Sequence, residues 1–250
     1  MRITINGSEV EVQRGEYVLD VARRNNIDIP SLCHDEALGG GACCRICLVE
    51  VMANKKSKVV TSCVYPVTEE MEVITDSHKL RRLRRTLLML LLARAPKNKV
   101  IQKMAEEYQA QVVARFSSAA GEDCILCNLC VSACDKLGTS AISTVNRGVT
   151  KEVATPFDEP SHSCIGCAAC AGVCPTQAIK VSEDNDKRVI WNAEFELIRC
   201  SQCNQPFATR QQLEHLNKKL HVDLQAYNAH HLCQTCRARV QVRHNDLSSV

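Results

Sequence analysis

The sequence contains few large aromatic side chains. Its 250 residues include one Trp, four Tyr and four Phe. We therefore expect the small cores of this chain to form partly around bound groups, whose binding energy becomes folding energy. Long apolar segments are also missing. The longest run, from Thr86 to Ala93, is far shorter than the roughly 20 residues that a membrane-spanning helix needs.

Motifs typical of enzymes are missing as well. The sequence has no G-x-G-x-x-G after an expected strand, no P-loop and no paired catalytic carboxylates. The glycines at 39–41 belong to a cysteine-rich loop instead. The chain opens with MRITINGSEVEV, a strand pattern without an apolar signal region, so we expect a reducing, cytoplasmic location. These absences argue against an enzyme that acts alone.

Cysteine, by contrast, is abundant, and the 17 cysteines form four tight groups. Disulfide scaffolds are short and secreted, so this pattern favours metal ligation. Ligating cysteines are thiolates, and four sites of four thiolates, each with a net charge of about −2, would change the formal charge of +3 to roughly −5. The pI of 8.1 therefore gives no reason to expect nucleic-acid binding.

Two runs of the form C-x2-C-x2-C-x3-C begin at Cys124 and Cys164, and the second run ends in Cys-Pro. They resemble bacterial two-cluster ferredoxins, in which the fourth cysteine of each run ligates the other 4Fe–4S cluster. The resemblance implies that cluster one is held by Cys124, Cys127, Cys130 and Cys174. It implies that cluster two is held by Cys134, Cys164, Cys167 and Cys170. A hairpin is expected between the runs, around residues 146–148.

Residues 1–78 predict a small α+β module. Asn6-Gly7 indicates a hairpin, and residues 17–24 have helical spacing. Four cysteines follow with the spacing C-x10-C-x2-C-x15-C: Cys33, Cys44, Cys47 and Cys63. They suit a 2Fe–2S cluster, because the glycine loop lets the backbone approach it closely. Spacing alone leaves zinc or buried thiols open. We interpret Cys43 as a non-ligand neighbour and His34 as an ordinary loop residue.

The stretch PSLCHDEALGGGACCRICLVEV resembles the N-terminal 2Fe–2S module of iron–sulfur subunits from respiratory complex I, NAD-reducing hydrogenases and [FeFe] hydrogenases. The resemblance implies a β-grasp fold and favours Cys44 over Cys43 as the ligand. Such subunits often carry a further cluster held by one His and three Cys. This chain has no cysteine between Cys63 and Cys124, so we expect that cluster to be absent. Electrons would then pass directly between the two modules or take separate routes.

Residues 79–122 predict two helices separated at Pro96. The first has an apolar stripe made of Leu80, Leu83, Leu87 and Leu90. Four arginines lie off this stripe: Arg81, Arg82, Arg84 and Arg85. We interpret them as a solvated helix face, with a patch for docking a partner as the alternative.

Residues 184–250 carry two C-x2-C pairs, formed by Cys200, Cys203, Cys233 and Cys236. Two such pairs make a closed four-thiolate site, for which we expect structural zinc, with a further 4Fe–4S cluster or a single iron as alternatives. The segment between the pairs predicts a helix after a capping box at Thr209 and Gln212. His230 and His231 are expected to be exposed. The region resembles C-terminal tails of ferredoxin-like subunits of formate hydrogenlyase complexes.

The sequence thus predicts an α+β chain in four parts. These are a β-grasp 2Fe–2S ferredoxin domain (1–78), a helical linker (79–122), a two-4Fe–4S ferredoxin domain (123–183) and a zinc-ribbon-like four-cysteine module (184–250). We expect an electron-transfer subunit of a multisubunit oxidoreductase, of the hydrogenase or formate dehydrogenase type, that binds a catalytic subunit. The alternative is exchange of electrons with a flavin NADH dehydrogenase or bifurcating module. A regulatory zinc or iron–sulfur protein is the third hypothesis.

Overall fold

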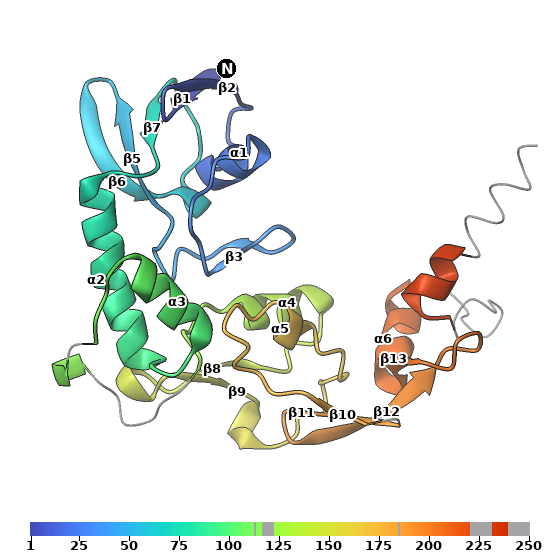
Figure 1. Ribbon diagram of the computed structural model, residues 1–250. Helices are drawn as coiled ribbons and strands as arrows, with labels where there is room; N and C mark the ends of the chain where they lie inside the picture. Colours follow the sequence, from blue (N-terminus) through green and yellow to red (C-terminus); the bar gives the residue numbers. More distant parts are fainter. Residues whose placement is uncertain (113, 117–122, 185, 221–231, 240–250) are drawn as a thin grey trace, which may run out of the picture. The chain divides into compact units, whose positions relative to one another are not determined.

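The computed structural model describes residues 1–112, 114–116, 123–184, 186–220 and 232–239. The chain divides into two compact units. The first unit comprises residues 1–133 and 173–178, and the second comprises residues 134–172 and 179–250. Both units combine helices with sheets, as expected for an α+β chain (Figure 1). None of the helices in the described residues is both long enough and apolar enough to cross a bilayer.

The first unit begins with a five-stranded sheet in the order β2-β1-β7-β5-β6. Its strands are β1 (Arg2–Ile5), β2 (Ser8–Glu11), β5 (Leu48–Ala53), β6 (Lys56–Thr61) and β7 (Glu72–Ile74). Strands β1 and β7 are parallel, and the other neighbours are antiparallel. The predicted hairpin is confirmed, because Asn6 and Gly7 connect β1 to β2 with positive φ angles.

Helix α1 (Val18–Arg24) supplies one side of the first hydrophobic core. Its four buried residues, Val18, Leu19, Val21 and Ala22, pack with Ile3, Ile5, Val49, Val51 and Val73 of the sheet. The helical spacing predicted for residues 17–24 is therefore confirmed. After α1, a short hairpin of β3 (His34–Asp35) and β4 (Gly39–Gly40) leads into β5, and the 3-10 turn η1 (Ser62–Val64) follows β6.

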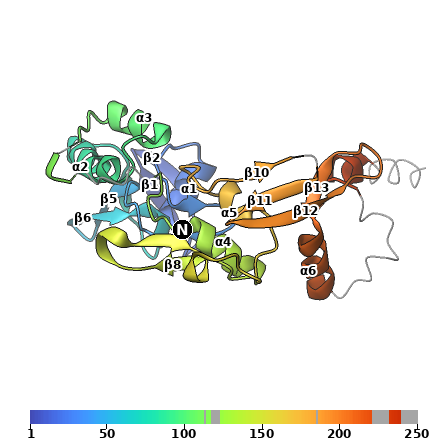
Figure 2. The same ribbon diagram turned by 90° about the horizontal axis from the view of Figure 1, so that it is seen from below.

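The two predicted helices of the linker are present as α2 (His78–Arg94) and α3 (Lys99–Glu107), which pack against each other (Figures 1 and 2). A short 3-10 turn, η2 (Ala114–Phe116), follows them. The predicted stripe on α2 is only partly right. Four of the buried positions, Leu80, Arg84, Leu88 and Leu92, recur every four residues, and Ala93 is buried as well. Leu90, by contrast, is 47% exposed.

The second unit begins within α4 (Leu129–Leu137). The predicted hairpin is confirmed as the antiparallel pair β8 (Ser143–Val145) and β9 (Glu152–Ala154), with η3 (Gly148–Thr150) between them. The 3-10 turn η4 (Pro156–Asp158) and the short helix α5 (Ala169–Gly172) follow.

An antiparallel sheet in the order β10-β11-β12-β13 completes the second unit (Figure 2). Its strands are β10 (Ser182–Glu183), β11 (Lys187–Ile190), β12 (Ala193–Arg199) and β13 (Pro206–Thr209). Helix α6 (Arg210–Leu220) packs against β12 and β13. As predicted, Thr209 caps it: the Thr209 hydroxyl oxygen accepts the Gln212 N–H at 3.1 Å. His230 and His231 lie outside the described residues.

Candidate metal centres

The structure brings together the four cysteines of the N-terminal module, Cys33, Cys44, Cys47 and Cys63, all of which are buried. The Cys44 N–H donates to the Cys33 sulfur at 3.4 Å. The Cys44 and Cys63 thiols lower the pKa of Cys33 to about 2, and the Cys63 thiol lowers the pKa of Cys47 to about 6. The contact with Cys33 raises the pKa of Cys44, and the contacts with Cys33 and Cys47 raise the pKa of Cys63. The four sulfurs thus form one compact donor set, in which a bound metal would replace the protons that these thiols share.

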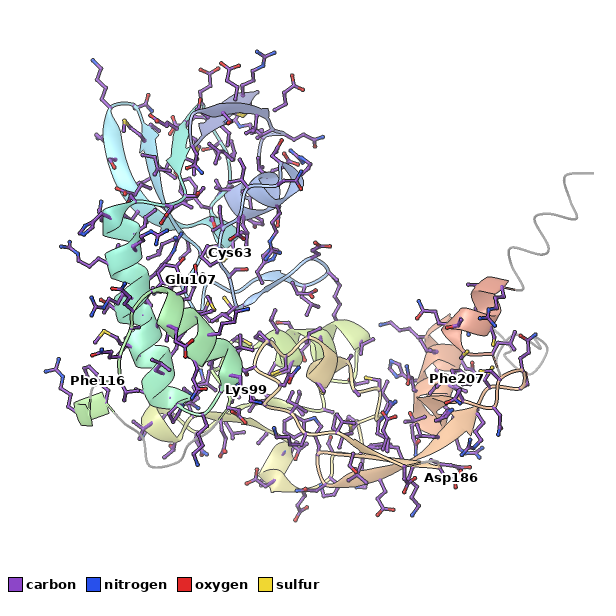
Figure 3. The ribbon with its side chains drawn as sticks, viewed as in Figure 1. Cys63, Lys99, Glu107, Phe116, Asp186 and Phe207 are labelled. Carbon is purple, nitrogen blue, oxygen red and sulfur yellow. The ribbon has the colours of Figure 1, made fainter. Side chains whose placement is uncertain are left out.

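Glycine lets the backbone close over this site. A Cβ on Gly40 would lie 2.7 Å from Cβ and 3.0 Å from Sγ of Cys63, which stands in η1 (Figure 3). Cys43 differs from the four buried cysteines, because it is exposed and its thiol donates to the Gly41 carbonyl at 3.3 Å. The site therefore combines close backbone approach with four buried sulfurs, an arrangement that fits a small inorganic cluster.

Arg84 of α2 supports the loop that carries two of these cysteines. Its guanidinium donates to the carbonyls of Ile46 at 3.1 Å, Leu48 at 2.6 Å and Thr75 at 2.8 Å. Ile46 lies between Cys44 and Cys47. Interpreting Arg84 as part of a solvated face is wrong: the residue is 1% exposed, because three carbonyls offset the cost of burying its charge. Arg81, Arg82 and Arg85 are exposed.

His34 is also more than an ordinary loop residue. Its side chain is 2% exposed, and Nε2 lies 3.0 Å from a carboxylate oxygen of Asp20. Its Nδ1 lies 2.9 Å from the Arg23 guanidinium. Both partners belong to α1, so these contacts fix that helix to the segment next to Cys33.

The first unit also contains all four cysteines predicted for cluster one: Cys124, Cys127, Cys130 and Cys174. Burial, together with the smaller effect of the neighbouring Cys174 and Cys124 sulfurs, raises the pKa of Cys127 to about 11. Backbone amides point at two of these sulfurs: Leu126 N–H donates to Cys124 at 3.4 Å, and Ala178 N–H donates to Cys174 at 3.3 Å. Such N–H groups suit an iron–sulfur cluster, whose sulfurs accept hydrogen bonds.

Two residues, at the end of α2 and at the start of α3, contact the two chain segments of this second donor set. Arg94 donates from Nε to the Cys124 carbonyl at 2.8 Å. Asn98 donates from Nδ2 to the Thr176 carbonyl at 2.8 Å, while its Oδ1 caps α3 by accepting the Val100 N–H. The prediction of a helical linker for residues 79–122 did not include these hydrogen bonds, because Arg94 and Asn98 are far in the sequence from the carbonyls that they bind.

The second unit contains the four cysteines predicted for cluster two: Cys134, Cys164, Cys167 and Cys170. They line one cavity, whose other walls include Ile142, Ile165, Ile190 and Trp191. Ala141 N–H donates to the Cys134 sulfur at 3.2 Å, the counterpart of the bond from Ala178 to Cys174. Four cysteine sulfurs are the soft donors that a 4Fe–4S cluster takes, so the lining of this mostly apolar cavity suits such a cluster.

The division into units matches the exchanged ligand pattern. Cys174 belongs to the unit that contains the first three cysteines of the other run, and Cys134 belongs to the unit that contains Cys164. Burial raises the pKa values of Cys164 and Cys170, and the Cys134 thiolate raises both further. Each unit thus gathers three cysteines of one run and the last cysteine of the other.

In the first unit, the 2Fe–2S candidate site and the site predicted for cluster one share a hydrophobic core. Cys33, Cys44 and Cys127 belong to the same buried group as Leu88, Leu92 and Ile101 of α2 and α3. A Cβ on Gly41 would lie 3.9 Å from the Cys127 carbonyl oxygen. Residues of the two candidate sites therefore pack directly on each other.

The C-terminal cysteines Cys200, Cys203, Cys233 and Cys236 form a fourth group, with all four sulfurs within 4.8 Å of one another. The Cys203 and Cys233 sulfurs are 3.7 Å apart. Phe207 of β13 and Leu232 pack against the group (Figure 3). This compact four-thiolate set fits a tetrahedral metal ion.

Comparisons with known proteins agree with this picture. Residues 1–78 match a 2Fe-2S iron-sulfur cluster binding domain, and residues 118–181 match a 4Fe-4S dicluster domain. The chain therefore contains both kinds of ferredoxin-type domain, as the sequence predicted.

Two curated relatives cover most of the chain. It is 34% identical over 210 residues to the NADP-reducing hydrogenase subunit HndD of Solidesulfovibrio fructosivorans, covering 72% of this chain and 36% of that protein. It is 30% identical over 230 residues to a subunit of the NADH-quinone oxidoreductase of Rhizobium meliloti (strain 1021), covering 81% of this chain and 26% of that protein. The chain thus spans little more than a third of the relatives' length, or less.

The structure is similar to one chain in a crystal structure of an NAD+-reducing [NiFe]-hydrogenase in the H2-reduced state. The TM-score is 0.60 with 25% identity, and the match covers 71% of this chain and 85% of that chain. The predicted resemblance to iron–sulfur subunits of hydrogenases and NADH-quinone oxidoreductases is confirmed. The similarity of the tail to formate hydrogenlyase subunits stays a prediction.

Proposed function

We propose that this chain is an electron-transfer subunit of a multisubunit oxidoreductase of the hydrogenase or formate dehydrogenase type. It would relay single electrons between a catalytic subunit and a second redox partner. The observation that supports this most is the core shared by Cys33, Cys44 and Cys127, because it contains cysteines from both candidate cluster sites. The alternative, exchange of electrons with a flavin NADH subunit, is favoured by the similarity to the NADH-quinone oxidoreductase of Rhizobium meliloti.

The proposal assigns the cofactors to the four cysteine groups. A 2Fe–2S cluster belongs to Cys33, Cys44, Cys47 and Cys63, in a β-grasp domain of residues 1–78. After the linker of residues 79–122, the domain of residues 123–183 holds two 4Fe–4S clusters with exchanged fourth ligands. Residues 184–250 form a zinc-ribbon-like module with zinc at the last four cysteines. None of the 17 cysteines is in a disulfide, which agrees with a reducing, cytoplasmic location.

When bound, the clusters supply reversible one-electron chemistry. The chain's own residues do the rest. Amide donors from Leu126, Ala141 and Ala178 aim at ligand sulfurs, and hydrogen bonds to sulfur are one of the means by which proteins set cluster potentials.

Anaerobic purification of the full chain tests the cofactor assignment. We expect a brown, reducible protein with about ten irons per chain, from one 2Fe–2S and two 4Fe–4S clusters, and one zinc. Colourless protein with several zincs per chain would contradict the proposal. Oxidation of formate, hydrogen or NADH by the chain alone would contradict its role as a relay. Proteins that copurify with the native chain would identify the catalytic partner.

A pair of matched variants tests the ligand exchange. Cys174→Ser should first remove the EPR signal of the cluster that Cys124 ligates, and Cys134→Ser should first remove the signal of the cluster that Cys164 ligates. Cys127→Ser and Cys167→Ser identify the two signals independently of the exchange. If Cys174→Ser removes the same signal as Cys167→Ser, each run holds its own cluster and the assignment is wrong.

A further inference from the structure

The sheet of the second unit contacts the loop that carries Cys164 and Cys167. Arg188 of β11 donates from Nη1 to the Gly166 carbonyl at 2.7 Å, and the Thr209 hydroxyl donates to the Ile165 carbonyl. The Phe195 ring of β12 covers Gly166 so closely that a Cβ there would lie 2.4 Å from its Cγ. These residues all follow the segment that matches the 4Fe-4S dicluster domain. The sheet is thus an additional wall around cluster two.

Trp191 lies in the two-residue turn that joins β11 to β12. Ile190 pairs with Ala193, and Trp191 and Asn192 both have left-handed conformations, with φ angles of 53° and 58°. Hairpins of this kind normally place Asn, Asp or Gly at these positions. A bulky residue with a positive φ is an outlier that costs about 1–2 kcal/mol. The turn holds a tryptophan despite this strain, which points to a role for its side chain.

The indole ring lines the same cavity as the four cysteines of cluster two. Its Nε1 is buried and has no hydrogen-bond partner among the described residues. Buried polar groups are nearly always paired. The indole N–H is therefore available to an acceptor in the cavity that the four cysteines line.

Cys170 and Trp191 line the same cavity, together with Cys134, Cys164 and Cys167. The buried indole N–H therefore shares an enclosed space with four cysteine side chains. Indole N–H is a donor only, so a cluster sulfide or a ligand thiolate sulfur is a chemically suitable partner.

We propose that Trp191 donates its indole N–H to a sulfur of the 4Fe–4S cluster held by Cys134, Cys164, Cys167 and Cys170, and thereby raises the reduction potential of that cluster. This inference rests on the proposed assignment of cluster two. Reduction adds negative charge to the cluster, so a hydrogen bond to its sulfur stabilises the reduced state more than the oxidised state. Trp191 acts as a positioning and tuning residue, and it does not ligate iron.

Trp191→Phe tests the proposal, because it keeps an aromatic ring in the cavity and removes only the donor. In an EPR-monitored redox titration of the full chain, we expect the potential of cluster two to fall. Loss of a tenfold preference for the reduced state corresponds to about 59 mV for one electron. The potentials of the 2Fe–2S cluster and cluster one should not change. The cluster two signal is identified as the one that Cys167→Ser removes.

Phe157→Leu is a matched control. Phe157 also belongs to the second unit and also has a positive φ, of 59°, but its side chain is 94% exposed. The substitution changes an aromatic residue in a strained turn without changing the cavity. It should leave the potential of cluster two unchanged.

A measurement on the wild-type chain does not depend on how the variant folds. The chain has one tryptophan, so feeding 15N-labelled indole marks Nε1 of Trp191 alone. ENDOR of reduced cluster two should show coupling to this 15N and to an exchangeable proton. Absence of both couplings, with two 4Fe–4S signals present, would overturn this inference and leave the proposed function intact. Absence of a second 4Fe–4S signal would overturn the proposed function and this inference together.

Discussion

At the scale of single residues, Gly40 occupies a position where any side chain would collide with Cys63. Gly40→Ala places a Cβ 2.7 Å from a ligand side chain that cannot move without displacing its sulfur. Overpacking of this kind costs about 1–3 kcal/mol. We expect a lower content of 2Fe–2S cluster per chain and a lower melting temperature, measured by spin quantitation and thermal unfolding.

Gly172→Ala is the control for this prediction. A Cβ on Gly172 would meet nothing within 4 Å, and Gly172 has no positive φ. The 2Fe–2S content of this variant should equal that of the wild type. If Gly40→Ala also retained the full content, the close approach of the backbone to Cys63 would not be required for the cluster.

Arg84 is a second residue whose loss has a clear expected effect. Arg84→Met keeps a long apolar side chain and removes the donor to three carbonyls. We expect the free energy of unfolding to fall by about 3 kcal/mol or more, because each hydrogen bond to a charged group contributes about 1.5–3 kcal/mol. Denaturant unfolding of the loaded chain measures this. Arg85→Met, at an exposed neighbouring position, should change stability by no more than about 0.5 kcal/mol.

Arg84 and Trp191 also show what the sequence could not predict. The cysteine groups were predictable because metal-ligating cysteines recur at short, characteristic intervals along the sequence. The partners of Arg84 are up to 38 residues away, at the ends of strands, so the helical pattern alone makes it look like its exposed neighbours. Trp191 lies beside the candidate cluster-two site because the sheet that follows the second cysteine run packs against the loop of Cys164 and Cys167. The spacing of residues in the sequence does not predict this packing.

At the scale of secondary structure, the turn between α2 and α3 combines a helix cap with a contact to cluster one. Asn98→Ala should remove the cap of α3 and the bonds that Nδ2 donates to the Thr176 carbonyl and the Asp123 carboxylate. Loss of a cap costs about 1 kcal/mol. Asn98→Ser keeps a cap acceptor, but its side chain is too short to replace the Nδ2 donor, so this variant isolates the loss of those two bonds. We expect both variants to lose cluster one faster than the wild type in air.

Ser77→Ala provides the comparison for Asn98. The Ser77 hydroxyl oxygen caps α2 by accepting the Leu80 N–H at 3.2 Å. The hydroxyl itself donates to the Glu50 carboxylate of β5, which is not part of a cysteine loop. This variant should lose a similar amount of helix stability without faster loss of cluster one. Equal rates of cluster loss in the Ser77 and Asn98 variants would show that the contact with Thr176 contributes nothing.

At the scale of the whole molecule, the second unit connects the C-terminal metal site to cluster two through one sheet. Strand β12 ends next to Cys200 and β13 begins shortly after Cys203, and these strands also carry Phe195 and Thr209, which contact the loop of the candidate cluster-two site. Removal of the metal proposed for the C-terminal site by a chelator, or Cys203→Ser, should therefore make cluster two more labile. The 2Fe–2S cluster and cluster one belong to the first unit and should keep their stability, as EPR during a timed exposure to air would show.

The two-unit division itself was only partly predictable. Sequence spacing separates the cysteine groups and suggests modules in a row along the chain. In the structure, residues 173–178 belong to the first unit although they follow most of the second cysteine run. The exchange of fourth ligands predicts that Cys174 lies with the first cysteine run. The sequence does not predict that Asn98, at the start of α3, binds the same segment through the Thr176 carbonyl, because Asn98 belongs to no ligand motif.

This return has a consequence for the order in which the chain matures on the ribosome. Once Cys63 has been translated, all four cysteines of the N-terminal site are present in the nascent chain. The first cofactor can therefore be inserted early. The donor set around Cys124 stays incomplete until Cys174 has been translated, by which time the three cysteines at 164–170 have also appeared. Both cubane sites thus become complete within a few residues of each other. A nascent chain arrested before that point would hold one cluster, and scaffold proteins that deliver 4Fe–4S units would meet two acceptor sites almost at once.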